Sequence, residues 1–532
     1  MTVAEMTLTG EMLIGGRAVR GAESVTHAVN PATGAELEPA FGGGTQADVD
    51  AACALAEAAF DPYRATSLER RAKFLEAIAQ GILDLGDVLV ERVMSESGLP
   101  RPRVEGERGR TVGQLRLFAS LAREGRWLNA TLDRAMPDRK PLPRADLRAQ
   151  RIPVGPVAVF SASNFPLAFS VAGGDTAAAF AAGCPVVAKA HSSHLGTSEL
   201  VGRVIQKAVA DCGLPEGVFS LLVGGGSTVG EALVQHPAIQ AVGFTGSRRV
   251  GRRLVALAAG REVPIPVYAE MSSINPVFLL PGALAQRAEA IAQGLIDSVT
   301  LGTGQFCTKP GIVMGIAGPD FDRFRATAQA AVEAKAATTM LNSGIHRAYC
   351  NGASDWGKDG GVRTLSAGSE PTPGSYAGQP KLFATTAQHF LESPNLMEEV
   401  FGPAAMLIEC SGIDEFIVVA KYLNGQLTAT LHLTEQDTEI ARVLVPLLER
   451  KAGRILVNGF PTGVEVCYAM VHGGPSPATS DNRVTSVGAM SIERFLRPVC
   501  YQDFPAVLLP ESLQDANPLH LWRLVEGKLQ QQ

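Results

Sequence analysis

Residues 154–190 read VGPVAVFSASNFPLAFSVAGGDTAAAFAAGCPVVAKA, and this stretch begins and ends with short apolar runs rich in Val and Ala. Runs of this length are typical of buried β-strands, and the longer segment between them predicts a helix. Two more such runs follow, VFSLLV at residues 218–223 and AVGFTG at 241–246. The helices expected between the strands cover residues 167–182, 197–212 and 228–236. Strands that alternate with helices predict a doubly wound parallel sheet.

The same pattern recurs in a second block, from about residue 270 to 470. Its strand-like runs are INPVFLL (274–280), AAMLIEC (404–410), LTATLHL (427–433) and GRILVNG (453–459). Upstream of both blocks, residues 60–97 carry apolar side chains at helical intervals, which predicts amphipathic helices packed on a sheet. The prediction is therefore an α/β fold with two large domains.

Three segments fit this pattern poorly. Residues 143–155 and 478–492 belong to neither block, and we expect them to pair with another subunit. RPRVEGERGR, residues 101–110, mixes both signs of charge and predicts a solvated surface segment.

The composition of the 532-residue chain is that of a large globular protein, with 46% hydrophobic and 19% charged residues. The formal net charge is −6 and no segment concentrates Lys and Arg, so we expect no nucleic-acid partner. Eight cysteines are scattered without C-x-x-C spacing, which predicts neither a metal site nor disulfides. The N-terminal residues lack the pattern of a signal peptide, and prolines interrupt the uncharged stretch 152–174. We therefore expect a cytoplasmic protein without a membrane partner.

Glycine-rich turns follow two of the predicted strands. GGGSTVG, residues 224–230, and FTGSRRVG, residues 244–251, each open a predicted helix. Glycine lets the backbone approach a pyrophosphate, and the N–H groups at a helix N-terminus bind anions. The candidate cofactor contacts are Gly226, Gly230, Gly246, Ser247 and Gly251. Glycine turns without a ligand are an equally good interpretation of these motifs taken alone.

Three polar residues are candidates for chemistry, and each has a structural alternative. Cys307 lies in the glycine-rich stretch GTGQFCTKPG, residues 302–311, and could be a nucleophile or a small core residue. Glu270 ends a predicted strand and could be a base or the cap of a turn. Asn164 follows another strand, and its amide could hold an oxyanion or cap a helix.

These residues belong to a longer series of motifs. In order along the chain they are Asn-Phe-Pro at 164–166, Lys189, FTGS at 244–247, Glu270, GQFC at 304–307 and EVFGP at 399–403. That series resembles the aldehyde dehydrogenase superfamily, and the similarity extends over nearly the whole chain. It implies the fold of that family: a doubly wound cofactor domain, a second α/β catalytic domain and small oligomerisation strands.

The resemblance also implies roles for individual residues. Cys307 would be the nucleophile that forms a hemithioacetal, and the Asn164 amide with the Cys307 N–H would hold the oxyanion. Glu270 would be the general base that hydrolyses the thioester remaining after hydride transfer. The other implied contacts are Lys189 to the adenosine ribose, Glu399 to the nicotinamide ribose, Phe401 beside the nicotinamide ring and Phe165 in the substrate pocket.

The domain organisation implied by the resemblance is that of a homo-oligomer. Residues 1–137 and 157–269 would form the dinucleotide-binding domain, and residues 270–476 the catalytic domain. Residues 138–156 and 477–502 would supply the oligomerisation strands, followed by a C-terminal extension at 503–532.

Two departures from the family pattern bear on flexibility and on the cofactor. Leu-Gly-Gly commonly follows the family glutamate, whereas Met-Ser-Ser follows Glu270, which predicts a less flexible backbone there. NAD-preferring members carry a glutamate three residues after the lysine, and Ser192 occupies that position. With Lys189, His191 and His194 nearby, we expect NADP as cofactor, with NAD as an alternative.

The substrate prediction rests on three stretches, residues 163–200, 270–277 and 457–479. They are most similar to family members that oxidise 2-oxoglutarate semialdehyde, which is also called 2,5-dioxovalerate. An anionic aldehyde needs a cation in its pocket, and the sequence alone places no arginine there. A broad-specificity aliphatic or fatty aldehyde dehydrogenase is therefore the alternative.

Other classes of protein remain as rivals. A cysteine-dependent hydrolase or acyltransferase could use Cys307 with His472 as its base, although nothing in the sequence brings these two together. A CoA-acylating dehydrogenase would differ only in the acceptor of the acyl group. A non-catalytic binding protein on the same fold is the third rival.

Overall fold

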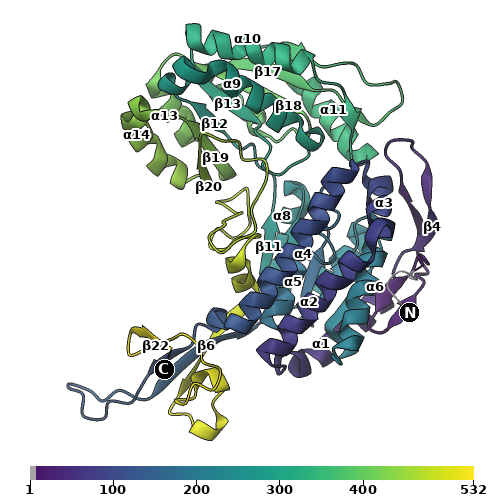
Figure 1. The fold of residues 1–532 in the computed structure, drawn as a ribbon, viewed down its shortest axis with the longest axis vertical. Helices are drawn as coiled ribbons and strands as arrows, with labels where there is room; N and C mark the ends of the chain where they lie inside the picture. The colour runs from purple at the N-terminus through teal and green to yellow at the C-terminus, as the bar shows by residue number, and fades with distance from the viewer. Residues whose placement is uncertain (1–6, 532) are drawn as a thin grey trace.

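The computed structural model describes residues 7–531. Residues 1–6, where the stretch without a signal-peptide pattern begins, and residue 532 lie outside the described part. Figure 1 shows two α/β lobes, one above the other, and an arm that carries β6 and β22 away from both. Each lobe is built around a seven-stranded sheet, and the arm around a five-stranded sheet. No helix within residues 7–531 is both long and apolar enough to cross a membrane.

The sheet of the lower lobe has the strand order β11-β10-β7-β8-β9-β1-β2. Its strands are β1 Met12–Ile14, β2 Arg17–Val19, β7 Val157–Phe160, β8 Val186–Lys189, β9 Phe219–Leu222, β10 Ala241–Thr245 and β11 Val267–Glu270. Strands β7 to β11 pair in parallel, and β1 and β2 extend the sheet antiparallel. The doubly wound parallel sheet predicted from the apolar runs is thus confirmed.

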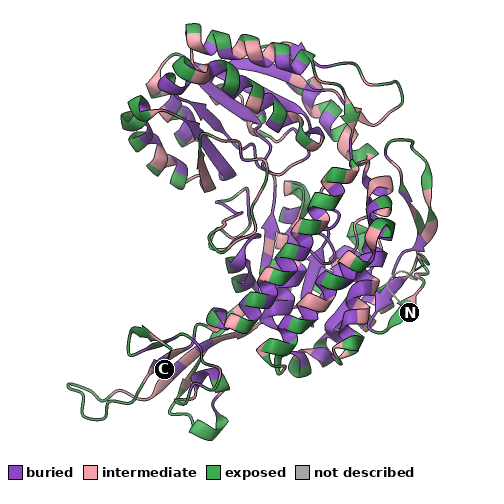
Figure 2. Ribbon diagram, viewed as in Figure 1, coloured by how far each residue is buried: buried purple, intermediate pink, exposed green. Residues whose placement is uncertain are grey.

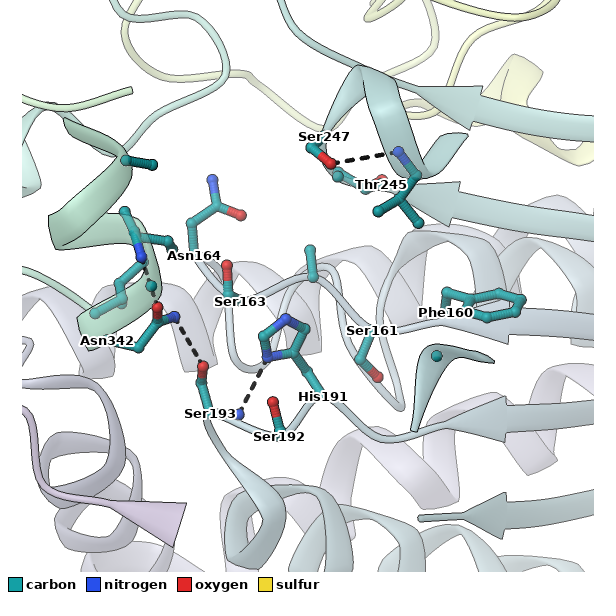
Figure 3. Close-up of a pocket in the computed structure, with 18 of the residues that line it drawn as sticks. Phe160, Ser161, Ser163, Asn164, His191, Ser192, Ser193, Thr245, Ser247 and Asn342 are labelled. Atoms are coloured by element: carbon teal, nitrogen blue, oxygen red, sulfur yellow. Dashed lines mark hydrogen bonds between the residues drawn. The ribbon is translucent and has the colours of Figure 1, made fainter. Parts of the chain in front are cut away.

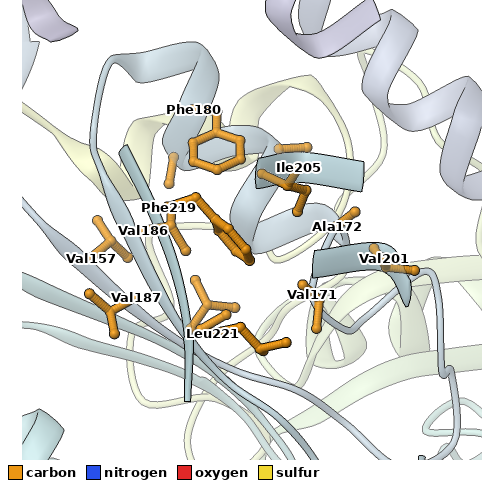
Figure 4. Close-up of a cluster of buried hydrophobic side chains, with 14 of the residues drawn as sticks. Val157, Val171, Ala172, Phe180, Val186, Val187, Val201, Ile205, Phe219 and Leu221 are labelled. Atoms are coloured by element: carbon orange, nitrogen blue, oxygen red, sulfur yellow. The ribbon is translucent and has the colours of Figure 1, made fainter. Parts of the chain in front are cut away.

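Helices cover both faces of this sheet (Figure 2). They are α5 Gly174–Ala182, α6 Leu195–Asp211, α7 Glu231–Gln235 and α8 Arg248–Ala259, with α1 Gln46–Arg64, α2 Leu68–Asp84, α3 Gly86–Ser97 and α4 Arg101–Glu124 before them in the chain. Figure 4 shows Val157 and Val186 of the sheet beside Phe180 of α5 and Ile205 of α6, all fully buried. The strands read as continuous apolar runs because both of their faces are covered.

The helix expected at residues 167–182 begins only at Gly174. The Glu107 carboxylate accepts the N–H groups of Leu167 (2.8 Å) and Ala168 (3.0 Å), so these residues form a turn around a buried acidic side chain. A sequence pattern cannot show this, because Glu107 lies about sixty residues away.

The prediction that residues 101–110 form a solvated surface segment is correct for only one face of this segment. These residues form the first part of α4, and both Val104 and Glu107 are buried. Buried residues continue at helical spacing through Leu115 and Phe118, so one face of the helix packs on the lower lobe. The charged residues that suggested solvent exposure include side chains that point toward the candidate site.

The sheet of the upper lobe has the order β15-β17-β18-β13-β12-β19-β20. Its strands are β12 Val277–Leu279, β13 Ile312–Ile316, β15 Arg363–Ala367, β17 Lys381–Thr386, β18 Ala404–Cys410, β19 Gln426–His432 and β20 Ala452–Val457. All of them except β15 run parallel, and the four strands predicted for the second block are among them. The covering helices are α9 Pro281–Thr300, α10 Pro319–Glu333, α11 Ser343–Lys358, α13 Ile413–Tyr422 and α14 Thr438–Glu449.

The arm consists of β21 Leu496–Gln502, β6 Leu147–Pro153, β5 Thr131–Asp133, β22 Arg523–Val525 and β23 Lys528–Gln530, in that order. The segment 143–155 therefore pairs with β21 of its own chain, and the C-terminal residues complete the same sheet. Residues 478–480, which we expected to pair with another subunit, contact β11 of their own chain instead. The Met271 N–H donates to Ala478 O at 2.8 Å, and the Ser480 N–H to Ala269 O at 3.0 Å.

Candidate active site

A cavity of about 1010 Å³ is lined by residues of both lobes. From the lower lobe come residues at the carboxyl ends of strands, among them Asn164, Lys189 and Glu270. From the upper lobe come Cys307 and Glu399, which lie just before β13 and β18. The cavity thus lies where the carboxyl edge of one sheet meets the amino edge of the other.

Cys307 occupies a loop whose backbone is held from several sides. The Asn275 side-chain amide donates to the Cys307 carbonyl at 2.8 Å. Gly304 has φ of +65°, and a Cβ there would lie 2.3 Å from the Gly402 carbonyl carbon, so this position requires glycine. The glycine-rich setting therefore serves a close approach of two backbone segments. Cys307 itself is not a core residue, because it lines two cavities.

Glu270 is held in place by two side chains from the segment between β20 and β21. His472 Nε2 lies 2.9 Å from Glu270 Oε1, and the Ser486 hydroxyl donates to Oε2 at 2.6 Å. Cys307 Sγ is 3.3 Å from the same His472 nitrogen. Within residues 7–531, His472 Nδ1 has no hydrogen-bond partner, which favours the tautomer that donates from Nε2. The structure thus brings His472 to Cys307, which the sequence could not do.

The ionisation of this group follows from burial and from these contacts. Burial alone would raise the pKa of Glu270, but the neighbouring His472 and the hydrogen bonds from His472 and Ser486 outweigh it and lower the pKa. Burial, and then the negative charge of Glu270, raise the pKa of the Cys307 thiol well above its ordinary value. The resting site therefore holds a protonated thiol beside an ionised carboxylate. Their reactive atoms lie within 4.8 Å of each other, so Glu270 is placed to accept the thiol proton.

Asn164 lies on the other side of Cys307, directly after β7. Its side-chain Nδ2 donates to Gln305 O at 3.1 Å, which leaves a second N–H of the amide for another acceptor. Asn164 does not cap a helix, because the next helix begins at Gly174. The amide is thus fixed against the Cys307 loop, within the same cavity.

Most of the expected cofactor contacts line the large cavity. They are Lys189, Gly226, Gly246, Ser247, Glu399 and Phe401. Figure 3 shows Ser247 at the start of α8 and Ser192 with His191 across the cavity from it. Gly230 and Gly251 do not line the cavity; a Cβ at these positions would meet Phe160 at 3.2 Å and Met271 at 2.7 Å. These two glycines allow close packing behind the wall.

Lys189 is the cation at this end of the cavity. Burial lowers its pKa to about 8, and its ammonium donates to Ala190 O at 3.1 Å. His191 is neutral, because burial and then the charges of His194 and Lys189 hold its pKa well below the ordinary value. Its Nδ1 accepts the Ser193 N–H at 3.1 Å.

A second buried ionisable pair connects the Cys307 loop with the EVFGP segment. The Lys309 ammonium donates to Val400 O at 3.1 Å and Ala404 O at 2.7 Å. Burial lowers the pKa of Lys309 to about 8, although Glu399 opposes this, and burial raises the pKa of Glu399 to about 7. Lys309 thereby fixes the segment that carries Glu399 relative to the loop that carries Cys307.

A smaller cavity of about 320 Å³ lies on the opposite side of Cys307. Aromatic side chains line it, namely Phe165, Phe169 and Phe306. Arg103 and Arg110 of α4 also line it, together with Glu107. Phe165 is thus placed in a pocket that reaches the thiol, as expected for a substrate contact.

Comparisons with known proteins agree with this geometry. The profile of the aldehyde dehydrogenase family matches residues 19–485. The chain belongs to the aldehyde dehydrogenase family. It is 60% identical over 524 residues to alpha-ketoglutaric semialdehyde dehydrogenase 2 of Azospirillum brasilense, covering 98% of this chain and 100% of that protein. It is 49% identical to alpha-ketoglutaric semialdehyde dehydrogenase of Acinetobacter baylyi, covering 98% and 99%.

The fold is that of solved aldehyde dehydrogenases. Aldehyde dehydrogenase C of Pseudomonas syringae, in complex with NAD⁺ and octanal, superposes with a TM-score of 0.78. The identity is 24%, and the match covers 93% of this chain and 97% of that one. The α/β architecture expected from the motif series is therefore confirmed.

Some residues of the site were missed by the sequence analysis. The sequence does not single out Ser486 or Lys309, because the role of a hydroxyl or an ammonium group depends on the groups that it contacts in the fold. Arg103 and Arg110 could have been found, because the neighbouring residues Val104, Glu107 and Thr111 keep a helical spacing of buried positions.

Proposed function

We propose that this aldehyde dehydrogenase oxidises 2-oxoglutarate semialdehyde to 2-oxoglutarate with NADP, and also accepts NAD. The observation that carries the proposal is the position of Cys307 between the two cavities, with Asn164 and Glu270 beside it. The substrate is taken from the relatives at 60% and 49% identity, since alpha-ketoglutaric semialdehyde is the same compound.

The residues of the chain carry out the acyl chemistry in this proposal. Glu270 accepts the proton of the Cys307 thiol, and the sulfur forms a bond to the aldehyde carbon. The free N–H of the Asn164 amide and the Cys307 backbone N–H then hold the oxyanion. After the oxidation step the acyl group remains on sulfur as a thioester. Once Glu270 has released the first proton to solvent, it removes a proton from the water that attacks this thioester. Cys307 leaves as the thiolate and regains this second proton.

The large cavity fits a nicotinamide dinucleotide, which when bound would supply the hydride acceptor. The N-terminus of α8, with Gly246 and Ser247, offers N–H groups to a pyrophosphate. Lys189 has ammonium protons left for ribose or phosphate oxygens. Glu399 would hold the nicotinamide ribose, with Phe401 beside the ring. Ser192 places no carboxylate near a 2′-phosphate, which supports NADP.

We further propose a cytoplasmic homo-oligomer whose interface is formed by residues 138–156 and 477–502, which include strands β6 and β21 of the arm. Val507 and Leu508 at the arm are 90% and 64% exposed in the single chain, and β21 is an edge strand. Exposed apolar side chains beside an unpaired strand edge are typical of surfaces that associate. The predicted domain boundaries at residues 157–269 and 270–476 stay part of this proposal.

The substrate and the cofactor are tested together by one panel. The kcat/KM values of 2-oxoglutarate semialdehyde, glutarate semialdehyde and butanal are measured, each with NAD and NADP. We expect kcat/KM to be higher for the two anionic aldehydes than for butanal, and we expect turnover with NADP. If butanal were preferred by about tenfold or more, the substrate assignment would be wrong. A strong preference for NAD would remove only the cofactor proposal.

One observation favours a second candidate function. The 3.3 Å contact between Cys307 Sγ and His472 Nε2 would suit a cysteine hydrolase or acyltransferase in the other tautomer, whose Nε2 can accept the thiol proton. The two functions differ in whether turnover needs a dinucleotide. A thioester substrate offered without NAD or NADP should be cleaved much more slowly than the aldehyde is oxidised with them; faster cleavage would favour the hydrolase.

A further inference from the structure

The small cavity contains two arginines of the same helix, and their surroundings differ sharply. Arg103 donates to the Glu107 carboxylate at 2.6 Å, and its guanidinium lies over the Phe165 and Phe306 rings. Its charge is therefore matched by an acidic side chain. Glu107 in turn accepts two backbone N–H groups with its other oxygen. The Glu107 carboxylate thus accepts three hydrogen bonds, and none of them comes from Arg110.

Arg110 has no such partner. Its Nε donates to Val464 O at 3.4 Å, and its guanidinium lies 5.2 Å from the centre of the Phe169 ring. Both terminal nitrogens are buried, and neither has a hydrogen-bond partner among residues 7–531. A buried guanidinium whose terminal N–H groups are unpaired loses its hydration without replacement, which is costly in the free protein.

From these contacts we infer that Arg110 is the anchor of an anion subsite, which binds the carboxylate of the substrate in the small cavity that Cys307 also lines. This inference rests on the proposed function, because it concerns the substrate of that reaction. The two free terminal nitrogens of a guanidinium match the two oxygens of a carboxylate.

The surroundings of Arg110 suit this role. The contacts to Val464 O and Phe169 fix the plane of the guanidinium, so little side-chain freedom is lost when an anion binds. The aromatic walls exclude water, which strengthens a charged hydrogen bond. The cavity of about 320 Å³ is lined by both Arg110 and Cys307 and has the volume for a short dicarbonyl chain. A carboxylate held at Arg110 would thereby direct the aldehyde end of the same molecule to Cys307.

The test compares anionic and neutral aldehydes in the full-length protein. The ratio of kcat/KM for 2-oxoglutarate semialdehyde over that for butanal is measured in the wild type, Arg110→Gln and Arg110→Lys. Arg110→Gln should lower this ratio roughly 100-fold, since the charge and the paired donors are lost. Arg110→Lys keeps the charge without the fork of donors and should lower it about tenfold.

The matched control is Arg116→Gln, which removes the same charge from an exposed position of α4 outside the cavity. It should leave the ratio unchanged. Inhibition by glutarate, which has no aldehyde, gives an independent measurement, and Arg110→Lys should weaken it in parallel. This second variant decides the question even if Arg110→Gln does not fold.

The outcomes separate the subsite from the proposed function. If the wild type prefers the anionic aldehyde and the Arg110 variants keep that preference, the subsite is wrong while the proposed substrate stands. If kcat/KM falls by the same factor for both aldehydes in the Arg110 variants, Arg110 is only structural and the inference is overturned. If the wild type itself shows no preference for the anionic aldehyde, the proposed substrate fails, and the subsite fails with it.

Discussion

The two seven-stranded sheets have similar parallel cores, yet they contribute to the site from opposite edges. In the lower lobe the functional positions follow strands: Asn164 after β7, Lys189 at the end of β8 and Glu270 at the end of β11. In the upper lobe they precede strands: Cys307 before β13 and Glu399 before β18. Only the lower lobe obeys the rule that ligands bind at the carboxyl ends of parallel strands.

The difference has a physical basis in what each edge offers. The carboxyl edge of the lower sheet is followed by helix N-termini, whose N–H groups suit a pyrophosphate. The amino edge of the upper sheet offers side-chain contacts that hold an irregular loop, such as the Asn275 amide on Cys307 O. In the proposed function, therefore, one lobe binds the cofactor and the other fixes the nucleophile.

The largest effect is expected from the upper lobe. Cys307→Ala removes the sulfur that forms the covalent bond, and kcat should fall on the order of 10⁴-fold or more. Cofactor binding, which depends mainly on the lower lobe, should stay close to that of the wild type when measured by fluorescence titration. Loss of cofactor binding in this variant would show that the two lobes do not divide the work in this way.

The next effect concerns the side chains that hold Glu270. His472→Leu removes one of the two donors, and kcat should fall about tenfold, the cost of one charged hydrogen bond. The pKa of Glu270 should also rise, because the hydrogen bond stabilises the ionised form. Glu270 must be ionised to act as a base, so the acid limb of the pH–rate profile should move to higher pH.

The matched variant is His472→Gln, whose amide can still donate to the carboxylate. It should restore much of the rate and return the acid limb toward the wild-type position. Ser486→Ala, which removes the other donor, should shift the limb in the same direction as His472→Leu. An acid limb that does not move in either variant would mean that Glu270 is not the titrating base.

The sequence predicted strands of both lobes, but it did not predict the setting of Cys307. Strands followed by glycine turns and helices form a local pattern, and β7, β8, β9 and β10 lie where their apolar runs are. Cys307 had no such pattern, because its setting depends on Asn275 and Gly402, which are distant in the chain. Its glycine-rich stretch made it a candidate, and the ordered series of family motifs implied the role of nucleophile.

Contacts between distant segments also explain what was missed or misplaced. Residues 101–110 looked solvated because their charges are visible in the sequence, whereas the pairing of Arg103 with Glu107 inside the fold is not. His472 could be named as a base but could not be placed, since it reaches Cys307 from 165 residues away. The role of a buried polar group depends on its hydrogen-bond partners, which a sequence pattern does not show.

The smallest effect is expected at the cofactor edge of the lower lobe. Ser192→Glu adds a carboxylate at an exposed position of the cavity wall. It should lower kcat/KM for NADP about fivefold, because an exposed like-charge contact costs up to about 1 kcal/mol. The value for NAD should not fall, and Ser192→Gln serves as the uncharged control of similar size. If kcat/KM fell equally with NADP and with NAD, the 2′-phosphate would not bind near residue 192.

The proposed mechanism requires an acyl group bound covalently to the Cys307 sulfur. Glu270→Gln keeps the thiol and removes the negative charge that raises the thiol pKa, so the thioester should still form, although more slowly. The thioester should then hydrolyse slowly, because the base that activates water is gone. The measurement is peptide mass mapping of Glu270→Gln after brief incubation with 2-oxoglutarate semialdehyde and NADP. We expect a 2-oxoglutaryl group on the peptide that contains Cys307, together with a burst of reduced cofactor. An unmodified Cys307 in a variant that still forms 2-oxoglutarate at the wild-type rate would contradict it.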